Sequence, residues 1–401
     1  MNTAKRSEQI IQKDQTYIMG TYGRLPVAAQ KGSNARLTDA DGREYIDFTS
    51  GIGVNSLGYS NSGWIRAVTE QLHAYQHISN YYSSEPCANL AEKLISGSGL
   101  KKVFFANSGA EANEGAVKLA RKYANDTFGE MKRPVIVTLK NSFHGRTMTT
   151  LTATGQEEFH KYFSPFAAGF RHTPINDVEA LDKALGEDVC ALMIETIQGE
   201  GGVNLMTDAY AGAVSDLCRE RGILLIIDEV QTGMGRTGRV FDHQYLGLKP
   251  DILTLAKGLG GGLPVGAFLC GEKLADVMGR GMHGSTFGGN PVVAAGANYV
   301  WDTVSSQDFL TKVVSKGEKI RGIVETWDLP CVKEIRGRGL MIGIAVTADI
   351  RKVLTACCEE GLLILTAGTD TLRLLPPLTI ENTDIEQGLD ILRRVLRMTE
   401  K

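Results

Sequence analysis

The chain of 401 residues carries a formal net charge of −3 at pH 7, with 43% hydrophobic and 22% charged residues. This is the composition of an ordinary globular protein, and the charge gives no electrostatic reason to expect a nucleic-acid partner. No stretch approaches the roughly 18 apolar residues of a membrane helix, and the first residues lack the apolar core of a secretory signal.

The cysteine pattern favours a reducing compartment. Seven cysteines occur at irregular spacing, without a CxxC pair. An odd and irregular set is typical of thiols rather than of a disulfide framework, so we expect a cytoplasmic protein. Adjacent Cys357 and Cys358 are expected to pack as small apolar side chains on a helix.

The N-terminal part contains two local patterns. Asp41-Gly42, between short apolar runs in residues 31–48, predicts a hairpin. His73 and His77 have the i,i+4 spacing of metal ligands on a helix. No third ligand follows at a suggestive spacing, so we interpret them as an exposed helical pair and expect no metal.

The middle of the chain alternates apolar runs with helical patterns. Continuous apolar runs of this kind predict an α/β fold with a mostly parallel central sheet, covered on both faces by helices. A helix is expected over about 111–124. The expected strands are 101–106, 134–139, 190–196, 222–229, 251–256 and 265–270.

The two ends of the chain differ from the middle. A helical segment at 311–327 is followed by short apolar runs at 340–346, 362–367 and 371–378. Together with the N-terminal hairpin, they predict a smaller α+β domain built from both termini. We expect an N-terminal segment of this domain over 1–52, a large domain over 53–305 and a C-terminal part over 306–401.

Two of the expected strands end in residues that carry chemistry. ILLIID ends at Asp228, and open α/β sheets bind ligands at the carboxyl ends of their strands. DILTLA runs directly into Lys257, which is followed by a glycine-rich stretch. A lysine held in a pocket loses proton affinity through desolvation and becomes a nucleophile for carbonyl groups. A helix cap for Asp228 and a surface position for Lys257 are the structural alternatives.

The segment FFANSGAEANE places small residues between a strand and a helix. Backbone N–H groups at such a helix start bind phosphate, and N-capping by Ser108 is the common structural alternative. A rival ligand is a dinucleotide, because Gly233, Gly235 and Gly238 form GxGxxG after a strand. However, DEVQT separates strand and glycines, and no long amphipathic helix follows, so we disfavour an oxidoreductase.

Nearly the whole chain resembles the class-III aminotransferases among the fold-type I enzymes that use pyridoxal 5'-phosphate. The motifs are long, specific and in the family's order. They are TYGRLPV (21–27), GIGVNSLGY (51–59), FFANSGAEANE (104–114), SFHGRT (142–147), IQGEGGV (197–203), DEVQTGMGRTG (228–238), TLAKGLGGG (254–262), HGSTFGGNP (283–291) and LRLLPPL (372–378).

This resemblance implies roles for the matching residues. Lys257 would hold the cofactor and move the proton during transfer, and Asp228 would pair with the ring nitrogen. Gln231 would contact the ring's phenolic oxygen, and Phe143 would stack on the ring. The other cofactor-binding residues implied are Ser108, Gly109, Ala110, Glu229, Val230 and, from the neighbouring subunit of a homodimer, Thr286.

The resemblance also implies two anchors for substrate carboxylates. Arg373 would bind the carboxylate beside the reacting carbon and Arg146 the distant one, since arginine binds a carboxylate bidentately. Glu200 would neutralise Arg373 when an ω-amine is bound, and Tyr22 and Ser285 would line the distal end. The expected substrates are N2-acetyl-L-ornithine and 2-oxoglutarate, with L-glutamate as product; ornithine, succinylornithine, succinyl-diaminopimelate and 4-aminobutyrate are alternative donors.

Overall fold

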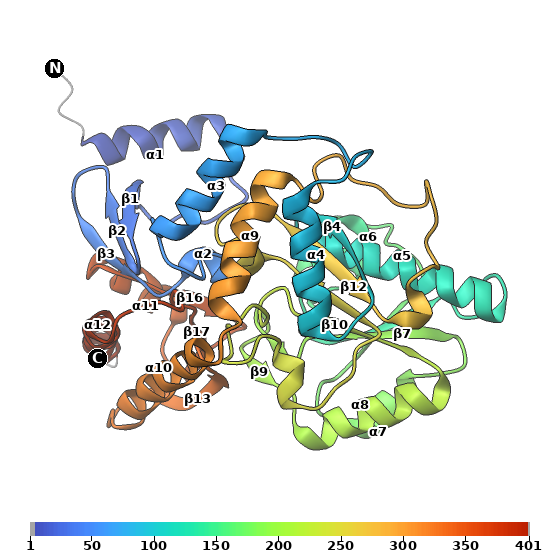
Figure 1. Ribbon diagram of the computed structural model, residues 1–401. Coiled ribbons are helices and arrows are strands. Elements are labelled where there is room, and N and C mark those ends of the chain that lie inside the picture. The colour runs from blue at the N-terminus through green and yellow to red at the C-terminus, as the bar shows by residue number, and fades with distance from the viewer. Residues whose placement is uncertain (1–4, 400–401) are drawn as a thin grey trace.

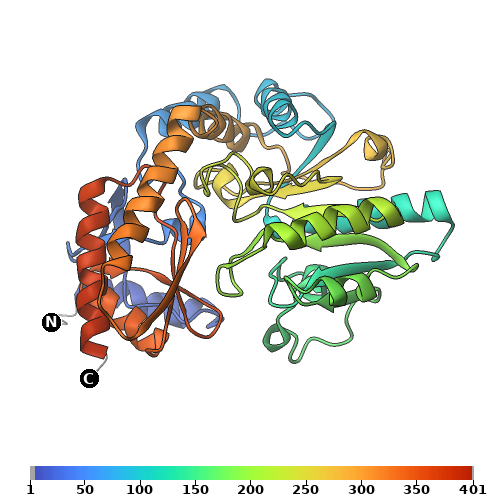
Figure 2. The same cartoon turned by 90° about the horizontal axis from the view of Figure 1, so that it is seen from below.

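A computed structural model describes residues 5–399 (Figures 1 and 2). In both views the N-terminal elements lie against the C-terminal ones, to one side of the central sheet. The α/β class, and the smaller α+β unit made from both termini, are therefore confirmed. The expected boundaries at residues 52 and 305 stay a prediction.

The central sheet has seven strands in the order β4-β12-β11-β10-β7-β5-β6. Only β12 is antiparallel to its neighbours, β11 and β4. Because β12 follows β11 after a short connection, it can return beside it without the helical crossover that a parallel neighbour needs. The strands are β4 (Lys102–Ala106), β5 (Val135–Leu139), β6 (Phe170–Thr173), β7 (Val189–Ile194), β10 (Leu224–Asp228), β11 (Ile252–Leu255) and β12 (Gly266–Cys270).

Side chains of β10 alternate between the two covered faces of this sheet. Leu225 and Ile227 join the core that includes α7 (Val178–Ala184) and α8 (Asp208–Arg221). Leu224 and Ile226 join the core under α5 (Gly109–Phe128), the helix expected over 111–124. Asp228 follows the same alternation, so its side chain belongs to the α5 face of the sheet.

Helix α5 lies directly against the sheet near its first turns. A Cβ added at Gly115 would stand 2.2 Å from Cε1 of Phe268, which no side chain tolerates. Gly115 therefore allows α5 to rest on β12, and this contact sets where the N-terminus of the helix points.

Three further helices pack together beside β4: α3 (Ser62–Ala74), α4 (Glu85–Ser98) and α9 (Pro291–Val304). Since α3 ends at Ala74, His77 lies beyond it, and the expected pair of histidines on one helix is wrong. The remaining elements of the large unit are α6 (Met148–Ala153), β8 (Ile197–Gln198), β9 (Asn204–Leu205) and the 3-10 turns η1 (Glu157–Phe159), η2 (Asp242–Tyr245), η3 (Lys257–Leu259) and η4 (Glu272–Leu274).

The smaller unit contains two sheets of four strands, ordered β1-β2-β3-β15 and β13-β14-β17-β16. The expected hairpin at Asp41-Gly42 is confirmed, because β2 and β3 pair antiparallel on either side of it. The C-terminal strand β15 pairs in parallel with β3 and so joins the two ends of the chain. The strands are β1 (Ala29–Ser33), β2 (Arg36–Asp39), β3 (Glu44–Asp47), β13 (Val332–Arg338), β14 (Met341–Val346), β15 (Leu362–Leu363), β16 (Leu365–Ala367) and β17 (Thr371–Leu374).

Helices cover these smaller sheets. Cys357 and Cys358 are both buried on α11, as expected, and no two of the seven cysteines form a disulfide. Between residues 5 and 399 no helix is both long and apolar enough to cross a membrane. The helices are α1 (Arg6–Tyr17), α2 (Ser50–Gly53), α10 (Gln307–Glu325), α11 (Ile350–Glu359) and α12 (Asn382–Thr399).

Candidate active site

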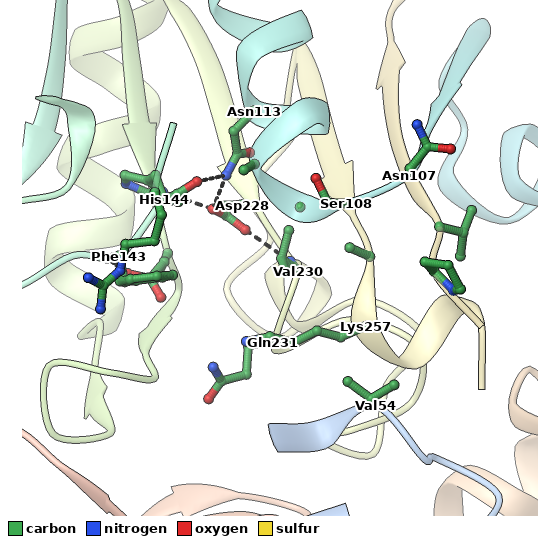
Figure 3. A pocket seen from close by; sticks show the side chains of 18 of the residues that line it. Val54, Asn107, Ser108, Asn113, Phe143, His144, Asp228, Val230, Gln231 and Lys257 are labelled. Atoms are coloured by element: carbon green, nitrogen blue, oxygen red, sulfur yellow. Dashed lines mark hydrogen bonds and ion pairs between the residues drawn. The ribbon is translucent and has the colours of Figure 1, made fainter. Parts of the chain in front are cut away.

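A cavity of about 440 Å³ opens at the carboxyl ends of β10 and β11. Its wall combines the β4–α5 turn, the loop after β5, the residues after β10 and the glycine-rich segment after β11 (Figure 3). Asp228 and Lys257, from the two adjacent strands, both line it. The ends of these two neighbouring strands therefore meet at one cavity.

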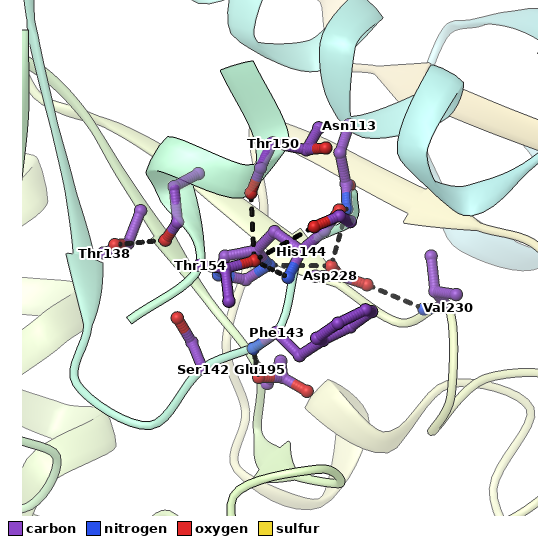
Figure 4. A network of polar contacts seen from close by, with 12 residues as sticks. Asn113, Thr138, Ser142, Phe143, His144, Thr150, Thr154, Glu195, Asp228 and Val230 are labelled. Carbon is purple, nitrogen blue, oxygen red and sulfur yellow. Dashed lines mark hydrogen bonds and ion pairs between the residues drawn. The ribbon is translucent and has the colours of Figure 1, made fainter. Parts of the chain in front are cut away.

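Asp228 is 4% exposed and is held by three donors. Its Oδ2 accepts from Asn113 Nδ2 and from His144 Nδ1, each at 2.8 Å, and its Oδ1 accepts from the Val230 N–H at 2.9 Å (Figures 3 and 4). Burial opposes charge on His144, but the hydrogen bond and charge of Asp228 outweigh it and raise the pKa of His144. The contact therefore favours a protonated imidazole at His144.

Lys257 follows β11 after one residue, Ala256, and has a left-handed backbone, with φ of 43°. This conformation is strained for a residue other than glycine, and such strain is concentrated at functional sites. Burial lowers the pKa of Lys257, and Arg373 lowers it further, while Glu200 and Asp228 oppose the shift. The lysine can therefore present a neutral amine to the cavity more readily than a surface lysine can.

The start of α5 faces the cavity through Ser108, Gly109 and Ala110. Ser108 Oγ caps the helix by accepting from the Glu111 N–H at 3.1 Å. The preceding N–H groups, of Gly109 and Ala110, have no acceptor within the helix. A Cβ at Gly109 would lie 2.8 Å from Cγ1 of Val230, so glycine is needed where this turn meets the β10 loop.

Phe143 and Arg146 line the cavity on the side of the loop after β5. The Arg146 guanidinium lies 3.9 Å from the ring centre of Phe159 and 5.5 Å from that of Phe143. Within residues 5–399 it forms no hydrogen bond or ion pair. Arg146 is thus a cation held in place by aromatic rings, with its hydrogen-bond donors unused.

Arg373 and Glu200 form a bidentate ion pair across the boundary between the two units. Arg373, 2% exposed on β17, donates to the two carboxylate oxygens of Glu200 at 2.7 and 3.0 Å. Gln231 accepts from Arg373 at 3.0 Å and donates to Glu200 at 3.3 Å. Burial opposes charge on Glu200, but Arg373 outweighs it and lowers the pKa of Glu200.

Comparison with known proteins identifies the family. The family described as aminotransferase class-III matches residues 17–396 of the chain. The chain belongs to the class-III aminotransferases. A relative from Haemophilus ducreyi named acetylornithine aminotransferase is 52% identical over 393 residues, covering 97% of this chain and 99% of the relative. Another of that name, from Caldanaerobacter subterraneus, is 47% identical and covers 96% and 99%.

Solved structures of class-III aminotransferases have the same fold. An ornithine aminotransferase from Toxoplasma gondii, described with pyridoxal phosphate at its active site, has a TM-score of 0.95 at 31% identity and covers 99% of this chain and 96% of that one. An N-acetylornithine aminotransferase from Stenotrophomonas maltophilia has a TM-score of 0.83 at 36% identity and covers 97% and 98%. Pyridoxal phosphate is the cofactor of this family and of this enzyme.

The cavity of this aminotransferase fits that cofactor. Pyridoxal phosphate presents a phosphate, a ring nitrogen and an aldehyde. The unpaired N–H groups of Gly109 and Ala110 suit the phosphate, the buried carboxylate of Asp228 suits the ring nitrogen, and Lys257 suits the aldehyde. Their side chains and N–H groups all line one cavity, which has room for a ring of this size.

Six residues that the resemblance assigned to the site do not line the cavity. Two of them, Glu200 and Arg373, contact the cavity residue Gln231, and the others are Tyr22, Glu229, Ser285 and Thr286. Glu229 faces the other side of β10, where it accepts from Asp242 N and from His243 N and Nδ1 at 2.7 to 2.8 Å. Tyr22 is 75% exposed and Thr286 is exposed as well. Ser285 lies nearer, because its Oγ accepts from Asn107, a cavity residue, at 3.1 Å.

The cavity wall also contains Asn113, His144 and Glu195, for which the sequence predicted no role. Glu195 accepts from the Phe143 N–H at 2.9 Å (Figure 4), and burial raises the pKa of Glu195 to about 7, with Asp228 adding to the rise and His144 opposing it. A signal for Glu195 exists, since it follows the apolar run of β7 as Asp228 ends that of β10. The rival glycines Gly233, Gly235 and Gly238 form turns, and the next element is the 3-10 turn η2 and not an α-helix.

Proposed function

We propose that this class-III aminotransferase transfers the ω-amino group of N2-acetyl-L-ornithine to 2-oxoglutarate. The products are N-acetyl-L-glutamate 5-semialdehyde and L-glutamate, as in arginine biosynthesis. The observation that carries the proposal is the bidentate pair between Glu200 and Arg373, which covers the carboxylate receptor nearest the reaction centre. The names of relatives at 52% and 47% identity support acetylornithine as the donor.

Lys257 and Asp228 have separate roles in the proposed reaction. When bound, pyridoxal phosphate supplies an electron sink for the carbon that loses its proton. Lys257 is proposed to hold the cofactor and then to accept and return that proton, which its lowered pKa favours. Asp228 is proposed to keep negative charge at the ring nitrogen, and the donors from Asn113 and His144 hold its carboxylate in place.

The two arginines explain how one site accepts two different substrates. Acetylornithine brings a single carboxylate, distant from its ω-amine, and 2-oxoglutarate brings a near and a distant one. Arg146, with unused donors, suits the distant carboxylate of both substrates. Arg373 suits the near carboxylate, which is present in only one half-reaction.

Glu200 is proposed to act as the exchangeable partner of Arg373. With an ω-amine bound, a buried Arg373 without a partner would be destabilised by several kcal/mol. Glu200 removes that cost, and the α-carboxylate of glutamate or 2-oxoglutarate must displace it. The arrangement therefore favours ω-amino donors over α-amino donors.

We also propose that two chains form a homodimer with shared sites. Thr286 and Tyr22 are exposed and lie outside the cavity of their own chain, which supports a role for both in the partner subunit's cavity. Thr286 would then bind the cofactor phosphate, while Tyr22 and Ser285 would contact the distal part of the substrate. The seven cysteines without a disulfide support a cytoplasmic location.

A panel of amino donors tests the proposed reaction. Single-turnover rates, read from cofactor absorbance as rate over apparent binding constant, should be highest for N-acetylornithine among N-acetylornithine, ornithine, succinylornithine, succinyl-diaminopimelate, 4-aminobutyrate and glutamate. A clear preference for another ω-amine would replace the donor and leave the reaction class unchanged.

Substitution of the ion pair tests the role of Glu200. Glu200→Ala should shift the ratio of N-acetylornithine to glutamate reactivity towards glutamate by roughly tenfold, the effect of about 1.4 kcal/mol. Arg373→Ala should impair glutamate more than N-acetylornithine. An equal loss with both donors in Glu200→Ala would mean that Glu200 only supports the pocket.

A further inference from the structure

Glu200 lies in a turn between β8 and β9 that is fastened to the smaller unit. The Glu200 carbonyl accepts from the Gly368 N–H at 2.9 Å. Two residues later, the Gly202 carbonyl accepts from Arg336 through Nε at 2.9 Å and Nη2 at 2.7 Å. Both contacts cross from the large unit to strands or turns of the smaller one, so the backbone from the Glu200 carbonyl to Gly202 is held against the smaller unit.

Arg336 connects this turn with the strand that carries Arg373. Its Nη2 also donates to Thr371 Oγ1 at 2.9 Å, and Thr371 is a fully buried residue of β17. Thr371 and Arg373 are two residues apart on that strand, so their side chains leave the same face. One guanidinium therefore links the two backbone segments that hold the partners of the Glu200–Arg373 ion pair.

The turn also has no room to withdraw on its other side. A Cβ added at Gly201 would stand 2.4 Å from the carbonyl oxygen of Asn141, in the loop after β5. On β14, a Cβ at Gly343 would stand 2.8 Å from Cβ of Val203, the residue that follows the turn. The turn is thus enclosed between the large unit and the sheet β13-β14-β17-β16.

We propose that Arg336 is a positioning residue that fixes the backbone of Glu200 relative to Arg373. With this backbone fixed, Glu200 releases Arg373 only by rotating its side chain, and the turn itself does not move. Arg336 thereby strengthens the preference for ω-amino donors over donors with an α-carboxylate. This inference rests on the proposed role of Glu200, and Arg336 itself does not line the cavity.

The chain offers a matched control for this inference. Arg321, on α10, donates to the carbonyls of Ile335 at 3.2 Å and Gly337 at 2.8 Å, on either side of Arg336. It therefore binds the same strand through the same kind of arginine–carbonyl contact. It does not reach the Glu200 turn or β17, so its removal reports only the effect of loosening β13.

The experiment compares Arg336→Ala, Arg321→Ala and Glu200→Ala in the holoenzyme. Single-turnover rate over apparent binding constant is measured with N-acetylornithine and with glutamate. Arg336→Ala should move the donor ratio towards glutamate by roughly threefold, a part of the roughly tenfold shift expected for Glu200→Ala. Arg321→Ala should leave the ratio at the wild-type value, whatever its effect on thermal stability.

Two conservative variants protect the test against misfolding. Arg336→Lys keeps the charge, but one ammonium group cannot bind Gly202 and Thr371 with the geometry of a guanidinium fork, so a smaller shift in the same direction is expected. Thr371→Val removes the hydroxyl, with its hydrogen bonds to Arg336 and to Asp370, and should act likewise.

The outcomes separate this inference from the proposed function. A shift with Arg336→Ala and none with Arg321→Ala supports the positioning role. If Glu200→Ala shifts the ratio but both Arg336 variants do not, or if Arg321→Ala shifts it equally, the positioning role is refuted and the role of Glu200 stands. If Glu200→Ala itself leaves the ratio unchanged, the exchange of partners and the positioning role are both refuted.

Discussion

Asp228 and His144 meet in a buried contact of 2.8 Å between Oδ2 and Nδ1, although 84 residues separate them in the chain. The imidazole occupies one oxygen together with Asn113, while Val230 binds the other. The carboxylate is thereby fixed in position before a cofactor ring arrives. A preorganised charge of this kind stabilises a developing charge without having to reorient.

Asp228→Asn should reduce turnover by about 10²-fold or more, because the amide keeps the shape and removes the charge at the ring nitrogen. Steady-state kinetics with saturating substrates measures this. Asp251→Asn is the control, since Asp251 caps the Leu225 N–H and pairs with Lys273 at the far end of the sheet. Activity of Asp228→Asn within a few-fold of wild type would assign Asp228 a structural role only.

Glu195→Gln should change how stability depends on pH. The folded enzyme raises the pKa of Glu195 to about 7, mainly through burial, against an ordinary value of 4.5. The folded state therefore holds a proton that the unfolded state has lost, and wild-type stability falls as pH rises from about 4.5 to 7. The glutamine variant lacks this loss, so its unfolding free energy relative to wild type should increase over that range.

Urea unfolding between pH 5 and 7.5 measures the unfolding free energy of the wild type and of Glu195→Gln. The amide is a poorer acceptor for two N–H donors, which adds a constant offset, so only the slope against pH is diagnostic. Glu220→Gln, at an exposed position on α8, should leave the slope unchanged. A slope equal to that of wild type in Glu195→Gln would contradict the prediction.

Phe159→Leu should weaken the binding of every substrate that carries the distant carboxylate. The leucine keeps apolar bulk but removes the ring that lies 3.9 Å from the Arg146 guanidinium, a contact of about 1 kcal/mol. KM for N-acetylornithine and for 2-oxoglutarate should rise by roughly fivefold, with kcat nearly unchanged. A simple diamine donor, which lacks that carboxylate, should react as with the wild-type enzyme.

Phe166→Leu is the control for this substitution, because Phe166 packs on His160 at 5.1 Å in the same loop. Equal effects of the two leucine variants, or an equal effect on the diamine, would show that Phe159 supports the loop and not Arg146.

Lys257 should be the sole point of cofactor attachment. Borohydride reduction of the holoenzyme followed by peptide mapping should place the pyridoxyl label on Lys257, and a label on any other lysine would refute the assignment. Lys257→Ala should still retain pyridoxal phosphate through the start of α5, while its turnover should nearly vanish.

Shared sites should permit complementation between two inactive variants. In a mixed dimer of Thr286→Ala and Lys257→Ala chains, one of the two sites has both residues intact if Thr286 acts on the partner's cavity. Mixing should therefore restore activity, up to about half of that of wild type per dimer. Verified mixed dimers without activity would show that each site is built from one chain.

The strongest sequence predictions concern residues at the ends of apolar strands. Asp228 and Lys257 could be assigned because a buried parallel strand fixes where its last residue lies. The start of α5 could be assigned because a small-residue turn between strand and helix exposes N–H groups. The direction of β12 could not, since an apolar run indicates burial and carries no information about orientation.

The contacts around these residues join segments that are far apart in the sequence, and no local pattern predicts such contacts. His144 and Asn113 meet Asp228 across 84 and 115 residues. Phe159 ends the short 3-10 turn η1, where no periodicity indicates that its ring supports Arg146. Tyr22 and Thr286 do not line the cavity of their own chain, so the role proposed for each depends on a second chain, which one sequence does not describe.

The pairing of β3 with β15 has a consequence for how the chain is made. β3 ends at Asp47 and β15 begins at Leu362, so a ribosome releases the N-terminal strands long before their partner exists. The central sheet is complete by Cys270 and can form during translation, as N-terminal parts of proteins do. Until β15 has been synthesised, one edge of β3 in the β2–β3 hairpin is unpaired, and an unpaired strand edge is prone to aggregation. Truncation of the last forty residues would therefore release strands at the opposite end of the polypeptide.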